Sequence, residues 1–333
     1  MDTKTVYREF CAKETSIPIF SRDWWLDAVA GEDGWDVALV VKDSTVLASM
    51  PYVRQRRFGM TVLTQPPLTQ KLGPWIRQTP GKISTRLAHE KEMMHSLIEQ
   101  LPPFDHFSQN WHYAYTNWLP FSWSGFSQTT RYTYVLDDLV HTEQIWKMLE
   151  CNIRNHCKKA VSRFGLDVRD DLPLSDFLYL NRATFQRQGM NVPYTDALVE
   201  RIDKACAERS CRKCFIAVDR DGRRHAGLYV VWDDDTAYGL MAGAEPSLRN
   251  SGANSLCHWE AIKHASTLAQ RFDFSGSMLE PVERFFRHFG ATQIPYFNIT
   301  KTPSRLLRLR RSMLSIMQSG SSVRRAGARP GGA

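Results

Sequence analysis

The sequence lacks the long hydrophobic run of a membrane protein and the paired cysteines of a disulfide framework. Its longest apolar stretches, such as residues 226–232, are far shorter than the roughly 18 residues that span a bilayer. The opening residues, MDTKTVYREF, contain no apolar segment typical of a secretion signal. The seven cysteines are odd in number, which suits free thiols in a reducing compartment. We therefore expect a cytoplasmic protein.

Signatures of metal binding and covalent catalysis are also missing. Cys211 and Cys214 have the spacing of a zinc knuckle, but no second pair follows them. The ten histidines and Cys257 show no pattern that pairs a nucleophile with a base. We expect no metal ion, no permanently bound cofactor and no covalent enzyme intermediate.

Charge is balanced over most of the chain. Eight of the 43 basic residues, and none of the 35 acidic ones, lie between Lys301 and the end, so residues 1–300 carry equal numbers of both signs. A polyanion-binding body is disfavoured because counterion release requires a concentrated cationic surface. The net charge of +8 belongs to the tail.

The composition is that of a folded globular protein, and 333 residues suffice for about two domains. Two β-hairpins are expected, over residues 37–53 and 215–232, each closed by a polar turn. Each is followed by a helix, over 85–101 and 253–270, and then by a short strand that opens with Phe-Asp. The repeated order favours an internal duplication, although hairpin, helix and strand is also a common succession.

The clearest helical pattern lies between the two halves, over residues 143–164. Its apolar side chains recur every three or four positions and predict one buried stripe. Arg154, Lys158, Lys159 and Arg163 occupy the other faces without a compensating acid. Such a run is either a solvated face or a site for an anion, because like charges on adjacent turns repel.

The junction Arg249-Asn-Ser-Gly-Ala-Asn254 is a further candidate anion site, where a loop leads into a helix. A glycine there lets backbone N–H groups approach an anion, and the helix start adds the positive end of its dipole. This arrangement suits a diphosphate or a terminal phosphate. The predicted binding residues are Arg249, Ser251, Gly252, Ala253 and Asn254.

Several segments resemble the FemAB-related, BioF2-like branch of the GNAT acyltransferases. The order of strand, Arg-x-x-Gly loop, helix and strand in the second half is similar to the GNAT core. The similar segments are 153–160, 251–254, 259–262, 272–277 and 285–290, with 17–20, 24–26, 66–70 and 72–75 in the first half.

The resemblance implies an α+β (α/β) fold of tandem GNAT-like lobes, each a mixed, mostly antiparallel twisted sheet flanked by helices. We place the lobes at residues 1–138 and 139–301, with the acyl-donor cleft in the second. Residues 302–333 form the basic tail. Its first part has the pattern of a basic amphipathic helix suited to an anionic membrane surface, and its end, rich in Gly, Ser and Arg, is expected to be disordered.

The implied activity is transfer of an acyl group from acyl-CoA, as co-substrate, to an amine of a small molecule or a lipid-linked cell-envelope precursor. Two alternatives stay open: a Fem-like aminoacyltransferase that uses aminoacyl-tRNA, and a non-enzymatic protein that binds a glycan or nucleic acid. The chain differs from the family at Asn254, where GNAT loops end in Gly or Ala. It also has Phe286, followed by Arg287, where Fem ligases carry lysine.

Direct attack by an amine requires a base, hydrogen-bond donors for the acyl oxygen and reactants held close together. Backbone N–H groups of residues 238–243 are expected to serve the oxygen. A carboxylate would hold or deprotonate the acceptor, and hydroxyl groups would donate hydrogen bonds. The predicted catalytic residues are Tyr238, Asp273, Ser275, Ser277 and Glu283.

Cationic and amide side chains are the candidates for binding an anionic acceptor or a donor phosphate. A solvated helix face is the competing interpretation for those between the two halves. The predicted substrate-binding residues are Arg154, Lys158, Arg187, Gln188 and Arg287.

Overall fold

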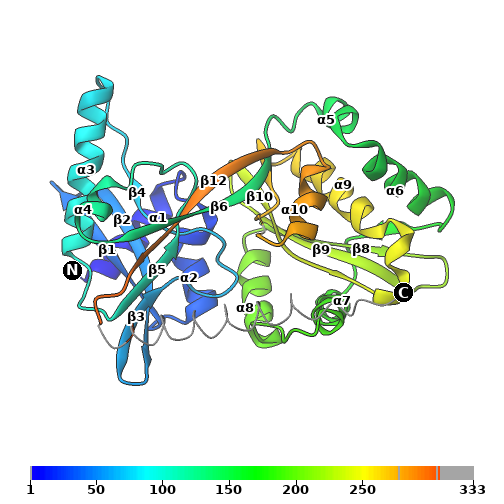
Figure 1. The fold of residues 1–333 in the computed structure, drawn as a ribbon, viewed down its shortest axis with the longest axis horizontal. Helices are drawn as coiled ribbons and strands as arrows, with labels where there is room; N and C mark the ends of the chain where they lie inside the picture. Colours follow the sequence, from blue (N-terminus) through cyan, green and yellow to red (C-terminus); the bar gives the residue numbers. More distant parts are fainter. Residues whose placement is uncertain (1, 277, 305–306, 308–333) are drawn as a thin grey trace, which may run out of the picture.

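The computed structural model describes residues 2–276, 278–304 and 307. One sheet runs through the molecule in the order β1-β2-β3-β5-β12-β6-β11-β10-β9-β8-β7, with β4 paired to β2. Helices cover this sheet in both halves of the molecule (Figure 1). The predicted fold class is confirmed, because the sheet is mixed, mostly antiparallel and flanked by helices.

The strands are short to medium in length, and most are paired with neighbours in the chain. Those of the first half are β1 (Trp35–Lys42), β2 (Thr45–Arg57), β3 (Met60–Thr64), β4 (Trp75–Ile76), β5 (His106–Asn110) and β6 (Ser127–Leu136). Those of the second half are β7 (Asp167–Arg169), β8 (Arg212–Val218), β9 (Arg224–Trp232), β10 (Thr236–Ala244), β11 (Arg271–Asp273) and β12 (Thr292–Lys301).

The helices lie before, between and after these strands. The first half contains α1 (Thr3–Lys13), η1 (Ile19–Ser21), α2 (Asp23–Ala30), α3 (Ile83–Glu99) and α4 (Leu119–Trp123). The second contains α5 (Thr142–Met148), α6 (Cys151–Ser162), α7 (Leu174–Arg187), α8 (Asp196–Ala207), η2 (Pro246–Ser251), α9 (Ala253–Ala265) and α10 (Glu280–Arg287).

The two halves repeat one topology. In each, an antiparallel hairpin, β1–β2 or β8–β9, is followed by a strand, a helix and a second strand parallel to the first. These parallel pairs are β3 with β5 and β10 with β11. A short helix and a long strand then complete each half. The repeat of strand order and direction supports the internal duplication.

The long strands β6 and β12 are shared between the halves. They pair antiparallel over nine residues and run side by side across the middle of the molecule (Figure 1). β6 also pairs with β11 of the second half, and β12 pairs with β5 of the first. The two expected sheets are therefore one continuous sheet, because each half contributes its last strand to both.

Alternating side chains place the core of the second half on both faces of the sheet. Ala226, Leu228 and Val230 of β9 belong to the cluster beneath α6 and α9. Tyr229 and Val231 belong to the cluster under α7 and α8. This alternation of period two explains why β9 is an almost continuous apolar run although it is a strand buried on both faces.

The single helix predicted over residues 143–164 is wrong, because the structure has two helices there. Leu149 and Glu150 are extended and separate α5 from α6. The guanidinium of Arg154 donates to the carbonyl oxygens of Lys147 and Leu149, each at 2.8 Å. These contacts satisfy carbonyl groups that the end of α5 leaves without a helical partner.

No helix in the described ranges combines the length and the apolar character that a bilayer crossing requires. The predicted amphipathic helix and disordered end of the tail lie outside the described residues, apart from its first positions.

Candidate functional site

The parallel strands β10 and β11 separate soon after they meet. Their register covers three residue pairs, from Thr236 with Arg271 to Tyr238 with Asp273. A bulge between Gly239 and Met241 then interrupts the pairing of β10 with β9. Bulges bend a strand and increase its local twist. The end of β10 therefore lies beside a gap in the sheet rather than beside another strand.

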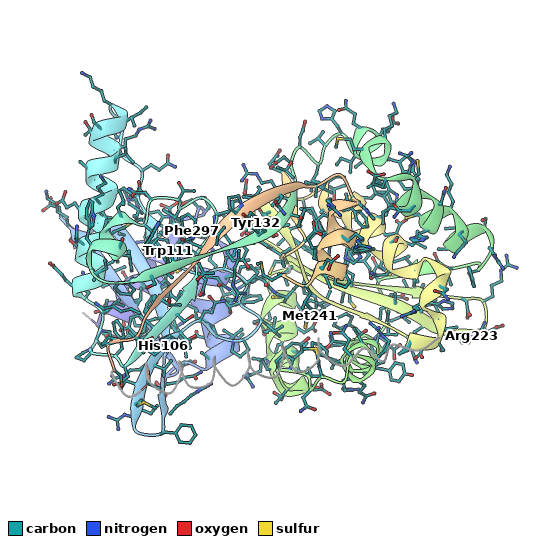
Figure 2. All side chains as sticks on the ribbon, in the orientation of Figure 1. His106, Trp111, Tyr132, Arg223, Met241 and Phe297 are labelled. Carbon is teal, nitrogen blue, oxygen red and sulfur yellow. The ribbon has the colours of Figure 1, made fainter. Side chains whose placement is uncertain are left out.

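A cavity of about 590 Å³ opens where β10 has separated from β11. Its walls come from the end of β10, the start of α9, the end of α7 and the apolar side of α10. Most of its surface is apolar. Its lining includes Arg187, Gly243, Arg249, Asn254, His258 and Phe286. Met241, labelled in Figure 2, marks the nearby bulge of β10.

A larger cavity of about 700 Å³ lies between the two halves and is lined by residues such as Arg77, Asp234 and Arg271. Volume alone does not identify a site. The smaller cavity is the stronger candidate because it combines an interrupted strand, a helix start and residues that the sequence singled out.

Helix α7 supplies hydrogen-bond partners for some backbone groups at the free edge of β10. Asn181 Nδ2 donates to the carbonyl oxygen of Ala242 at 2.9 Å, and the N–H of Ala244 donates to Thr184 Oγ1 at 2.8 Å. Gly243 is required between them, because a Cβ there would lie 2.4 Å from the backbone nitrogen of Asn181. The N–H of Ala244 therefore already has a partner, just beyond the stretch 238–243 expected to bind the acyl oxygen.

The mouth of the cavity is cationic. Arg187 and Gln188, at the end of α7, line it together with Arg249. Both arginines are exposed, and neither forms an ion pair with a carboxylate among the described residues. Ala253 and Asn254 add the N-terminus of α9, whose dipole favours an anion. The structure thus brings together five of the predicted binding residues from two separate segments.

The structure shows a packing requirement at Gly252. Its φ of 86° is left-handed, and a Cβ would lie 2.3 Å from the carbonyl oxygen of His156 in α6. Ser251, beside it, is also buried. Glycine is needed here so that α6 can pack against the loop.

His258 was missed by the sequence analysis although it lies one helical turn after Asn254. Its Nδ1 is 2.8 Å from the carbonyl oxygen of Asn254, so Nδ1 carries the proton and Nε2 keeps a lone pair. Burial lowers the pKa of His258 to about 4. The i, i+4 spacing was the signal that could have linked the two residues. The side chain is therefore a neutral imidazole in the wall of the cavity.

Tyr238 and Asp273 lie away from this cavity. Asp273 is fully buried, accepts a hydrogen bond from Thr133 Oγ1 and forms an ion pair with Lys71 of the first half. Tyr238 is also buried, and burial raises the pKa of its hydroxyl well above 10. The two residues join the halves, and their predicted catalytic roles are not supported by their positions.

Glu283 and Ser275 also lie outside the cavity lining. Glu283 accepts a hydrogen bond from the Tyr134 hydroxyl at 2.5 Å. Ser275 donates its N–H to Asp273 Oδ1 at 2.8 Å, and its buried hydroxyl has no hydrogen-bond partner among the described residues. Ser277 is outside the described residues.

Three predicted substrate-binding residues are not part of the cavity. Arg154 is engaged at the end of α5, as described above. Lys158 is exposed on α6, and Arg287 lies on the exposed side of α10, 3.6 Å from Glu283. Lys158 and Arg287 thus lie on helix surfaces, and Arg154 caps the end of α5. No cluster of three or more potential metal ligands occurs in the described part of the chain.

Comparison with known proteins agrees with this geometry. Residues 151–287 match the family model described as an acetyltransferase (GNAT) domain. That segment runs from α6 to α10 and contains every residue of the cavity lining. Among curated proteins, no match was found.

Solved structures share the fold of the whole chain at low identity. FemX has a TM-score of 0.64 at 12% identity, over 89% of this chain and 96% of FemX. L-PGS from Bacillus licheniformis has a TM-score of 0.52 at 9% identity, over 92% and 94% of the two chains. These likenesses concern the fold. Residues 151–287 thus match a GNAT acetyltransferase domain, in a chain whose overall fold is similar to that of FemX.

Proposed function

We propose that the protein transfers an acyl group from acyl-CoA to an amine by direct attack. The observation that carries this proposal is the cavity beside β10, because it joins an apolar interior to a cationic mouth. Acyl-CoA has a corresponding division, with a largely aliphatic arm, interrupted by amide groups, that ends in the thioester and an anionic diphosphate at the other end. The acceptor class is an amine of a small molecule or a lipid-linked precursor.

The donor's phosphates are assigned to the mouth. Arg249 and Arg187 supply positive charge, and the first N–H groups of α9 point along the helix axis toward the same region. Charge-assisted hydrogen bonds to phosphate are among the stronger ones in proteins. The arm is then assigned to the space between Gly243 and the apolar side of α10.

In the reaction, the amine nitrogen attacks the thioester carbonyl carbon, and the C–S bond breaks. The proton lost by the nitrogen ends on the departing sulfur, so no covalent enzyme intermediate is required. His258 is our candidate for the group that accepts the amine's hydrogen bond, because its Nε2 keeps a lone pair while Nδ1–H is held by Asn254.

Aminoacyl-tRNA is the second candidate donor, and the resemblance to Fem ligases favours it. The position where those ligases carry lysine is Phe286, which lines the cavity here. An aromatic ring in that place supplies no charge for a tRNA end. This contact supports acyl-CoA as the first donor to test.

Isothermal titration of the full-length protein with acetyl-CoA and longer acyl-CoAs tests the proposal. We expect Arg249→Glu to weaken binding about tenfold or more, because it removes a charge-assisted contact and adds repulsion. Lys158→Glu is the matched control and should leave affinity unchanged. Absence of CoA binding together with salt-sensitive tRNA binding would favour the second donor, and absence of both would favour a non-enzymatic role.

A further inference from the structure

His225 lies in the wall of the cavity beside β10, and the reaction described above gives it no role. It is the second residue of β9 and is 2% exposed. Its carbonyl oxygen accepts the N–H of Glu245, the first residue after β10, at 2.9 Å. Figure 2 labels Arg223, two residues before His225, at the outer end of the second half, and Met241 nearer the middle of the molecule. His225 is therefore at the outer end of the cavity, away from the bulge of β10.

The cationic mouth lies at the same end of the cavity. The N–H of Ala244, the last residue of β10, donates to Thr184 Oγ1, and Arg187 follows Thr184 by one turn of α7. Arg249 belongs to η2, which begins two residues after β10. The side chains of Thr184, Arg187 and Arg249 line the cavity together with His225. His225 thus shares the part of the cavity to which the donor's phosphates are assigned.

Asp219, in the turn between β8 and β9, holds one nitrogen of the His225 ring. Nε2 lies 3.1 Å from Asp219 Oδ2. The same carboxylate accepts the backbone N–H groups of Asp221 and Arg223 at 3.0 and 2.9 Å, and Arg223 Nε at 2.7 Å. Although burial opposes ionisation, the hydrogen bonds from His225 and Arg223 lower the pKa of the Asp219 carboxyl below its ordinary value. An ionised carboxylate only accepts hydrogen bonds, so Nε2 carries a proton.

The other ring nitrogen of His225 is left without a partner. Nδ1 is buried and forms no hydrogen bond within the described part of the chain. In the neutral ring Nδ1 carries a lone pair, and in the imidazolium it becomes an N–H donor. A buried polar atom without a partner is unfavourable and calls for a group that completes it. Because Nδ1 belongs to the wall of a cavity, a ligand can supply that group.

We propose that His225 binds the diphosphate of the acyl donor through Nδ1–H, and that the ring takes up a proton from solution as the donor binds. The inference rests on the proposed function, from which it takes the diphosphate as the ligand. Hydrogen bonds between two charged partners are stronger than neutral ones. Asp219 and the diphosphate would hold the imidazolium from opposite nitrogens. No covalent bond forms or breaks in this step.

The charges around His225 explain why the proton arrives with the ligand. The carboxylate of Asp219 favours the imidazolium, whereas Arg187 and Arg249 oppose it in the free protein. A diphosphate at the mouth brings negative charge, which cancels the opposition of the arginines. At about pH 8 an ordinary histidine is neutral, so binding should then draw a proton from the solution.

The remaining charged or titratable groups on the elements around His225 are paired, neutral or cationic. They are Asp176 with its ion-pair partner Arg224, Glu245 with the Tyr179 hydroxyl, Arg223 with Asp219 and Asp221, the exposed Arg220, and the neutral His258. Lys159 and Arg163 of α6 lie over the ring of Phe164, which contacts the His225 ring. These two cations also oppose protonation in the free protein. Protonation therefore depends on Asp219 and on the charge that occupies the mouth.

Calorimetric titration of the full-length protein with acetyl-CoA, at about pH 8 in buffers of different ionisation enthalpy, measures the protons taken up. We expect the wild type to take up as much as about one proton per ligand. His225→Gln should take up none of it and bind about fivefold or more weakly, because a charged donor is lost. His141→Gln, at an exposed histidine, is the control and should behave as the wild type. Equal proton uptake in wild type and His225→Gln would overturn the proposal.

Inorganic pyrophosphate is the second probe and separates this proposal from the choice of donor. If pyrophosphate binds with proton uptake that depends on His225 while acetyl-CoA does not bind, the diphosphate site stands and the proposed function fails. If neither ligand causes such uptake, the site is refuted.

Nitrogen-15 spectra of the wild-type histidines test the same step without a substitution. At saturating ligand, both ring nitrogens of His225 should show the chemical shifts of an imidazolium. A neutral ring in the bound state would contradict the proposal, even if His225→Gln fails to fold.

Discussion

At the scale of single residues, burial sets the protonation of two histidines, His258 in the cavity beside β10 and His112 in the larger cavity between the halves. Burial lowers the pKa of His258 to about 4, and burial together with the charge of Lys71 lowers that of His112 to about the same value. Both are neutral at pH 7. An unfolded chain binds a proton at each of them near pH 6.5, so acid favours unfolding.

This linkage predicts a loss of stability on acidification. The stability that each neutral, buried histidine preserves is fully present above pH 6.5. As the pH falls from 6.5 toward 4, protonation in the unfolded chain lowers the free energy of unfolding by up to about 3 kcal/mol per residue. His258→Phe should therefore lose less free energy of unfolding than wild type between pH 7.5 and pH 4.5, as measured by urea titration. His141→Phe, at an exposed site, is the control. An unchanged pH dependence in His258→Phe would contradict the assignment.

Individual site residues were predictable where local sequence determines their place. Arg249 and Asn254 adjoin a loop-to-helix junction, and both line the cavity. Asp273 was predicted as a catalytic carboxylate, and the structure pairs it with Lys71, which lies 202 residues away in the chain. A long-range ion pair of this kind leaves no local pattern.

At the scale of elements, the packing of α6 against the η2–α9 junction fixes the wall of the cavity. The contact depends on Gly252, where a Cβ would collide with the backbone of His156. Backbone atoms cannot move aside as a flexible side chain does. The loop can therefore take its place only with glycine at this position.

Gly252→Ala is predicted to lower the free energy of unfolding by about 2 kcal/mol or more, because a clash adds to the strain of a left-handed φ. Gly222→Ala is the control. Its φ is 78°, but no atom lies within 4 Å of the added Cβ, so about 1 kcal/mol is expected. Urea unfolding of both variants measures the difference. Equal losses would show that α6 does not press on the loop.

Elements with a strong local signal were predicted well. The hairpins expected at 37–53 and 215–232 correspond to β1–β2 and β8–β9, with ends that differ by a few residues. The break between α5 and α6 was missed because neither Leu149 nor Glu150 disrupts helices. Tertiary contacts there, including the carbonyl groups bound by Arg154, outweigh local propensity.

At the scale of the whole molecule, the halves are joined by shared strands and by one buried ion pair. Lys71 is 2% exposed and Asp273 is fully buried. The Lys71 ammonium also lies 5.3–5.8 Å from the ring centres of Tyr113, Tyr238 and Tyr296. The pair thus sits in an aromatic enclosure between the halves. Sequence periodicity could not reveal the sharing of β6 and β12, because the pairing of distant strands depends on the assembled fold.

Breaking this ion pair at one end should be far costlier than removing both charges. Lys71→Met leaves the carboxylate buried without its partner and should lower the free energy of unfolding by about 3–5 kcal/mol. In Lys71→Met/Asp273→Asn the uncompensated charge is gone, so most of that loss should be recovered. Urea unfolding of both single variants and the double variant gives the coupling. Additive losses would argue against a direct pairing across the halves.

The central claim is that the acyl donor binds beside the separated end of β10. Amide hydrogen exchange of the full protein, with and without saturating acetyl-CoA, tests it most directly because it locates the contact along the chain. We expect acetyl-CoA to slow exchange in residues 240–245, 252–257 and 279–286 and to leave exchange at 154–158 unchanged. Protection confined to residues 14–18 and 75–78, around the larger cavity, or no protection at all would contradict it.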